Sequence, residues 1–325
     1  MRTKTPALPW PFIWRRIQSL AGLWLVIFIV EHLLTNSTAA LYFGDDGKWF
    51  ITLVNHLHDL PYLQVVEVAV LGLPFLLHAL WGIQYALTAK HNNCSYSKKK
   101  PAMGKYVRNH GYTLQRITAW ILLVGVILHV FQMRFYDKPI AVEHGDTAYY
   151  AVRVGFDPGL YTLAPRLGVF LYDSAMVKQE QKRAESQRAV SDEWKGGTQF
   201  DLLAQKSAVE EQEVAELRQW ADALAARPIN AAQVIAVAPT FGTALLLRVR
   251  DVFKSPLMMI LYTLFVLSAV FHAFNGLWTF LISWGVILTA RTQDWAIWSC
   301  RGLMVLFALL GLVTIWCTSW INLYR

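Results

Sequence analysis

The stretch LMMILYTLFVLSAVFHA, residues 257–273, is the strongest indication of the fold, because it is a long apolar run without Asp, Glu, Lys or Arg. A helix that crosses a bilayer needs about 20 mostly apolar residues. Segments of this kind lie at residues 17–40, 63–88, 114–135, 257–290 and 297–320. The 325 residues are 55% hydrophobic and 16% charged, with 14 Trp. The sequence therefore predicts an all-α membrane protein with five transmembrane helices.

Each of the first four segments carries one histidine, namely His32, His78, His129 and His272. An ionisable side chain inside a bilayer is costly and usually marks a functional site. A single histidine of this kind is as compatible with a hydrogen bond to a neighbouring helix as with a metal ligand. Four histidines on four helices favour coordination of a cofactor.

The depths of these histidines predict how they pair. His32 lies fifteen residues beyond position 17, and His129 fifteen beyond position 114. At about 1.5 Å per residue both lie about 22 Å from the face where their helices start. The other two helices run in the opposite direction, which puts His78 and His272 roughly 8 Å from that face in a core of ~30 Å. Two bis-histidine haem sites are expected, roughly 14 Å apart along the membrane normal.

A short internal repeat accompanies the histidines. Residues 77–82 read LHALWG and residues 271–276 read FHAFNG, while Gln18 and Gln115 each lie fourteen residues before a histidine. The small residues near the histidines leave room for a flat macrocycle, although close helix packing is the alternative explanation. They are Ala79, Gly82, Gly125, Ala273 and Gly276.

The distribution of charge sets the orientation and argues against a nucleic-acid partner. The net charge of +8 is concentrated at the N-terminus and in residues 88–113, which hold basic residues and no acid. Positively charged loops stay in the cytoplasm, so the N-terminus is expected there. The three cysteines form no CxxC pattern, which excludes covalent c-type haem and cysteine-ligated iron–sulfur clusters.

Residues 137–255 differ from the rest, because they hold most of the acidic residues. We expect three regions: 1–136 with transmembrane helices one to three, 137–255 as a mostly helical extracytoplasmic insertion, and 256–325 with helices four and five. Within the insertion the pattern predicts helices over 174–190 and 198–226, and short strands over 148–154 and 233–237. Residues 243–253 are expected along the membrane surface. A structural role without chemistry is the simplest interpretation of the insertion.

The membrane core resembles a known family. The opening residues 15–22, RRIQSLAG, the sequence Glu31-His32-Leu33 and the histidines of helices two to four are similar to the cytochrome b558 subunits of succinate dehydrogenase, the single-chain dihaem anchors of succinate:quinone oxidoreductases and fumarate reductases. The resemblance covers roughly 10–136 and 256–320 and leaves out the insertion.

This resemblance implies a set of ligands and partners. His32 and His129 would bind the iron of the distal haem b, and His78 and His272 that of the proximal one. A flavoprotein and an iron–sulfur subunit would dock on the cytoplasmic face of a bacterial inner membrane. Electrons from succinate would reach a quinone, typically menaquinone. The chain itself holds no flavin or iron–sulfur motif, so it would not act on succinate.

Further candidate residues lie near the ends of the helices. A polar group at the inner ends of helices one and three is expected either to contact haem propionates or to snorkel to the interface: Arg15, Arg16, Gln18, Ser19, Gln115 and Arg116. Glu31 and Glu67 are the acids within the membrane segments and are candidates for a quinone or proton site.

Two other functions remain open from the residues alone. The cytochrome b subunit of a hydrogenase or formate dehydrogenase also carries histidines on several membrane helices, although often with two on one helix. A transporter or scaffold without haem could use the histidines for packing or proton relay.

Overall fold

The computed structural model describes residues 9–40, 45–88, 107–136, 138–145, 147–194 and 201–320, and the side chains of 107–108, 189–194 and 201–210 are not described. Most of the basic segment 88–113 lies outside these ranges. The chain divides into two compact units. The span unit comprises residues 1–37, 60–129 and 260–315, and the sheet unit comprises 38–59, 130–259 and 316–325.

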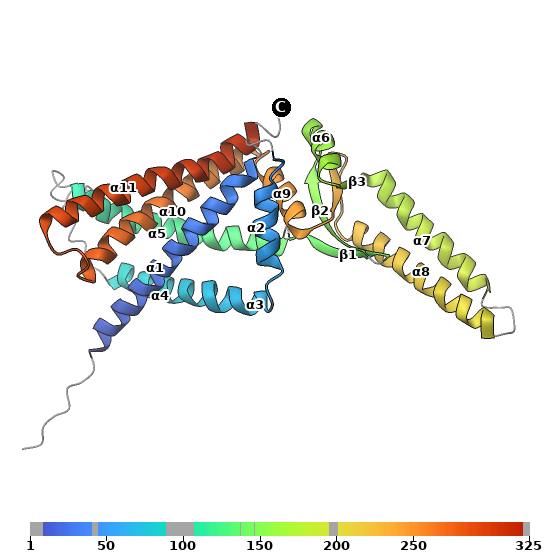
Figure 1. Ribbon diagram of the computed structural model, residues 1–325, viewed down its shortest axis with the longest axis horizontal. Coiled ribbons are helices and arrows are strands. Elements are labelled where there is room, and N and C mark those ends of the chain that lie inside the picture. The colour runs from blue at the N-terminus through green and yellow to red at the C-terminus, as the bar shows by residue number, and fades with distance from the viewer. Residues whose placement is uncertain are drawn as a thin grey trace, which may run out of the picture. The chain divides into compact units, whose positions relative to one another are not determined.

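Five helices are long and apolar enough to cross a membrane, which confirms the predicted fold class. They extend over Trp10–Ala40, Leu63–Thr88, Asn109–Tyr136, Pro256–Ser283 and Ala290–Trp320. Their regular parts are α1 (Trp10–Ser37), α4 (Leu73–Thr88), α5 (Val107–Val130), α10 (Pro256–Ser283) and α11 (Ala290–Leu312) (Figure 1). The first helix begins seven residues before the predicted segment, because the helix continues through Arg15 and Arg16.

The second span is not a uniform α-helix. Its first part, α3 (Leu63–Val66), leads into a π-helical segment over Glu67–Gly72, and α4 follows. Pro74 has no N–H to offer the carbonyl of Val70, four residues earlier. The indole Nε1 of Trp24 on α1 donates to that carbonyl at 2.7 Å. A backbone group freed within a membrane span is thus satisfied by a neighbouring helix.

The core of the span unit lies between α1, α10 and α11. The rings of Phe274 and Phe307 stack with centroids 5.4 Å apart. Gly311 permits α11 to lie close to α10, because a Cβ there would lie 2.4 Å from Val266 Cγ1. The buried residues of this cluster are Leu33, Val270, Ala273, Phe274, Cys300 and Phe307.

The sheet unit is built on a four-stranded antiparallel sheet with the order β1-β2-β4-β3. The strands are β1 (Ile140–His144), β2 (Thr147–Gly155), β3 (Phe170–Tyr172) and β4 (Gln233–Ala238). The predicted strands at 148–154 and 233–237 correspond to β2 and β4. Because side chains alternate along a strand, Val152 and Val154 enter one buried cluster while Ala151 enters the other.

Helices cover both faces of this sheet. On one face lie α6 (Pro158–Arg166) and α9 (Phe241–Val252), which contribute Leu160, Leu163 and Leu247 to the buried cluster. On the other lie α7 (Ser174–Trp194) and α8 (Asp201–Ala225), a helical hairpin that contributes Val177, Trp220 and Leu224 (Figure 1). The insertion therefore contains the expected hairpin and, in addition, a sheet with its own core.

One expectation for this region was wrong. Residues 243–253 do not present an apolar face to the membrane surface, because α9 packs on the sheet and buries Leu246, Leu247 and Val249. The connection after the first span forms a helix that the sequence pattern did not predict, α2 (Lys48–His58). This helix packs on α9, where Gly242 donates its N–H to Asn55 Oδ1 at 2.7 Å. Both features depend on contacts between residues far apart in sequence.

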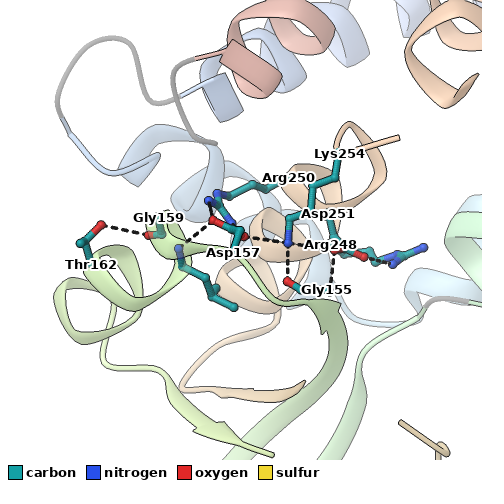
Figure 2. Close-up of polar contacts among 9 residues, drawn as sticks. Gly155, Asp157, Gly159, Thr162, Arg248, Arg250, Asp251 and Lys254 are labelled. Atoms are coloured by element: carbon teal, nitrogen blue, oxygen red, sulfur yellow. Dashed lines mark hydrogen bonds and ion pairs between the residues drawn. The ribbon is translucent and has the colours of Figure 1, made fainter. Parts of the chain in front are cut away.

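A buried ion-pair network fixes the end of α9 to the sheet (Figure 2). Arg250 donates to Asp157 at 2.7 Å, and Lys254 lies 2.8 Å from the same carboxylate. Asp157 also caps α6 by accepting from the N–H of Leu160. Burial alone would raise the pKa of Asp157, but the hydrogen bonds and charges of Arg250 and Lys254 outweigh it and lower the pKa below its ordinary value. The carboxylate therefore stays ionised.

Candidate functional site

The structure brings the four membrane histidines together in two pairs. His32 on α1 faces His129 on α5, with ring centroids 5.9 Å apart and planes at 84°. His78 on α4 faces His272 on α10, with centroids 6.2 Å apart and planes at 86°. These are the pairs that the depth calculation predicts.

The ring of His78 is held by the backbone of α1. Its Nδ1 lies 3.0 Å from the carbonyl oxygen of Gln18. Because a carbonyl can only accept, the proton must be on Nδ1, which leaves the lone pair on Nε2. Gly22 makes this approach possible, since a Cβ at that position would lie 2.8 Å from His78 Cε1. The structure therefore presents Nε2 as the free ligand atom.

His272 is held in an analogous way by α5. The hydroxyl of Thr118 lies 3.3 Å from Nδ1 of His272 and donates its own proton to the carbonyl of Leu114 at 2.8 Å. Thr118 must then accept from Nδ1–H, which again leaves Nε2 free. The side chain of Gln115 donates to the carbonyl of His272 at 3.0 Å, and Asn275 donates to Gln115 Oε1 at 2.7 Å.

His129 contacts two aromatic residues of α10. Its Nδ1 lies 3.0 Å from the hydroxyl of Tyr262, and the Phe265 ring lies 5.9 Å from its own, centroid to centroid. Gly125 accommodates Phe265, because a Cβ there would lie 2.4 Å from the Phe265 ring. On the opposite side of the pair, the His32 ring lies 5.4 Å from that of Phe28.

The sequence repeat has a structural counterpart. A Cβ at Gly82 would lie 3.8 Å from the side-chain nitrogen of Gln18, and one at Gly276 would lie 3.6 Å from that of Gln115. Each repeated glutamine on helices one and three thus lies against the repeated glycine that follows a histidine on helices two and four. The two copies of the repeat thus form the same kind of contact between two helices, and the glycines allow these helices to pack closely.

The donor set fits haem. Among the described residues there is no group of three or more His, Cys, Asp or Glu that could hold a metal ion. Two imidazoles per site suit an iron whose other four ligands come from a porphyrin. With metal–imidazole bonds of about 2.0 Å on either side of one iron, the ring centroids would lie roughly 6 Å apart, as observed for both pairs. The Nδ1 hydrogen bonds of three histidines are those expected around metal-bound imidazoles.

The polar residues predicted near haem propionates make protein contacts at the helix ends. Arg16 donates to the carbonyl of Ser283 at 2.6 Å, and Ser19 accepts from the indole of Trp284 at 3.1 Å. Arg116 donates to the carbonyl of Ala86 at 3.1 Å, and Arg15 lies over the ring of Tyr85. Contact of these residues with propionates stays a prediction.

The two carboxylates predicted for a quinone or proton site lie on different spans. Glu31 accepts a hydrogen bond from the hydroxyl of Thr35 at 2.8 Å, one turn further along α1. Glu67 begins the π-helical segment of the second span and is partly buried. Their role at a quinone or proton site also stays a prediction.

Sequence reasoning missed Gly22, Thr118, Tyr262 and Asn275. The repeat contains a partial signal for the first, because aligning Gln18 with Gln115 aligns Gly22 with Ala119, so both helices carry a small residue there. No comparable signal marks Tyr262, whose relation to His129 depends on how α5 and α10 pack.

Five apolar spans and two facing histidine pairs define a helical multi-pass membrane protein with the donor arrangement of a b-type cytochrome. The chain is similar to the succinate dehydrogenase cytochrome b558 subunit of Bacillus subtilis (strain 168), with 25% identity over 283 residues, 87% of this chain and 84% of the relative. The predicted resemblance is thereby confirmed. No family model and no solved structure matches the chain.

Proposed function

We propose that this chain is the dihaem cytochrome b membrane anchor of a succinate dehydrogenase. The observation that carries the proposal is the pair of facing imidazoles at each of two sites. In the pair of His78 and His272, Nδ1 is held by protein and Nε2 is left for iron. The name of the Bacillus subtilis relative supports it. Haem b, when bound, would supply one-electron redox chemistry.

The proposed role of the chain's own residues is to bind and orient the two haems. His32 and His129 would ligate one haem, and His78 and His272 the other. Gln18 and Thr118 fix the tautomer and orientation of His78 and His272 through Nδ1. The four histidines are partly buried among the spans, and the apolar surroundings of such a site control solvent access and thereby its redox potential.

The direction of electron flow follows from the orientation that we propose. With the N-terminus in the cytoplasm of a bacterium and the chain in its inner membrane, the His78 and His272 pair lies nearer the cytoplasmic face. A flavoprotein and an iron–sulfur subunit docked there would pass electrons from succinate into the membrane, first to the haem of His78 and His272. A quinone, for which we propose menaquinone, would be reduced near the other pair, with Glu31 and Glu67 as candidate proton carriers.

Haem content tests the proposal most directly. We expect two haem b per purified chain and a reduced-minus-oxidised spectrum of the b type. His32→Ala and His129→Ala should each remove one haem and spare much of the other, whereas His56→Ala, on the exposed side of α2, should remove none. A purified chain without b-type absorption would refute the proposal and leave a transporter or scaffold.

The partner assignment has its own test. We expect a flavoprotein and an iron–sulfur protein to copurify with the chain, and succinate to reduce the haems. In a His78→Ala variant, electron entry should be blocked. Haem reduction by succinate at the wild-type rate in that variant would contradict the proximal assignment, and copurification with a hydrogenase or formate dehydrogenase would replace the proposal with that family.

A further inference from the structure

The two histidine pairs differ in the groups that accept a hydrogen bond from Nδ1. In the pair of His78 and His272, the acceptors are a backbone carbonyl and an aliphatic hydroxyl. In the pair of His32 and His129, the partner of His129 is the phenol of Tyr262, 3.0 Å away. Neither the sequence repeat around the histidines nor their depth in the membrane requires this difference.

Tyr262 is placed by packing on α10. Its ring lies 5.8 Å from that of His129 and 6.2 Å from that of Phe265, centroid to centroid. Phe265 in turn fills the space that Gly125 leaves on α5. Since Tyr262 and Phe265 lie three residues apart on one helix face, the contact of α10 with α5 aims the phenol at Nδ1.

One helix therefore serves both pairs. Tyr262 and His272 lie ten residues apart on α10, which corresponds to a rise of about 15 Å. This rise matches the roughly 14 Å between the two levels of histidines. A change at Tyr262 is thus local to one pair, because it lies about three helical turns from the other.

A hydrogen bond from Nδ1–H makes an axial imidazole more basic and a stronger donor to iron. A stronger donor stabilises the ferric state more than the ferrous state, which lowers the reduction potential. For Nε2 of His129 to bind iron, its proton must be on Nδ1, so the Tyr262 oxygen is the acceptor in the loaded protein.

We propose that Tyr262 is a positioning residue that orients His129 and lowers the reduction potential of the haem held by His32 and His129. The inference rests on the proposed function, because it requires haem at that pair. Thr118 has the corresponding role for His272 in the other pair, which supplies a matched comparison within the same chain.

The test is a potentiometric titration of the purified complex, with the two haems resolved as separate components. Tyr262→Phe removes one oxygen and keeps the ring, and it should shift one component to higher potential. Thr118→Val should shift the other component upward. Leu264→Ala changes an exposed side chain of the same helix, two residues from Tyr262, and should leave both components near their wild-type positions.

Each outcome separates the inference from the proposed function. If the wild type has no haem, the proposed function fails. If it has two resolved haems and Tyr262→Phe shifts neither of them, or shifts both equally, the inference is wrong while the function stands. Tyr262→Leu, measured on the fraction that retains both haems, should reproduce the upward shift. An unchanged potential in that variant would equally overturn the inference.

Discussion

Replacing Gly22 with Ala is a severe test of the His78 site, because it adds one carbon at a place with no room for it. The new Cβ would lie 2.8 Å from Cε1 and 2.9 Å from Nδ1 of His78. Carbon atoms reach optimal contact at about 3.5–4.0 Å, so the methyl group and the imidazole would overlap by roughly 0.7–1.2 Å. The ring must move away from α1 or lose its hydrogen bond to Gln18.

The magnitude follows from two opposing effects. Ala is more favourable than Gly inside a helix by about 0.8–1.0 kcal/mol, so without the clash the substitution would stabilise α1. Overpacking costs about 1–3 kcal/mol, and loss of an outer hydrogen bond to a metal ligand typically lowers affinity by about 10–100-fold. We therefore expect a folded protein that retains the haem of His32 and His129 and loses most of the other.

The assay is haem stoichiometry with a redox titration on membranes and on purified protein. Gly302→Ala on α11 is the matched control, since a Cβ there meets nothing within 4 Å, and it should keep both haems. A Gly22→Ala protein with two haems at wild-type potentials would contradict this expectation, because it would show that the His78 ring does not depend on contact with the α1 backbone.

Three further changes test other contacts. Asp157→Asn should destabilise the protein by about 3–5 kcal/mol. Because the folded-state pKa of Asp157 is lowered, the ionised carboxylate stabilises the fold fully above about pH 4, and this contribution is lost as the pH falls through the folded-state pKa. The thermal unfolding temperatures of wild type and variant should therefore converge in acid. A difference that persists undiminished at low pH would contradict the assignment. Gly242→Ala would place a Cβ 2.6 Å from the carbonyl oxygen of Ile51 and should cost about 1–3 kcal/mol, seen as faster hydrogen exchange in α2, whereas unchanged exchange would argue against the α2 and α9 contact. Trp24→Phe leaves the carbonyl of Val70 without its indole donor and should lower unfolding stability in detergent by about 0.6–1.7 kcal/mol; an unaltered stability would show that this hydrogen bond contributes nothing.

The spans and the histidine pairing could be predicted because they depend on local properties. Apolar length identifies a membrane helix without knowledge of its neighbours, and a fixed rise per residue places His32 level with His129 and His78 level with His272. The strands over 233–238 and 147–155 were also visible, since an apolar or alternating pattern is a property of the segment itself.

The failures in the sheet unit have a common cause. The apolar residues of α9 were assigned to the membrane surface because a pattern shows that a face must be buried and does not show what buries it. The partner is the sheet, which forms from strands far apart in sequence. The helix α2 was missed for the same reason, since its buried face is defined by α9.

The amino-acid sequence alone predicts a five-span membrane protein with one histidine in each of four spans and two levels at which they pair. The packing of the helices sets which ring nitrogen His78 and His272 offer, because that depends on Gln18 and Thr118 from neighbouring helices, and it places the hydroxyl of Tyr262 at Nδ1 of His129. It also decided the role of Gly22, which is defined by a ring from another span. Backbone rise is a property of each helix alone, whereas a hydrogen bond between helices depends on their packing.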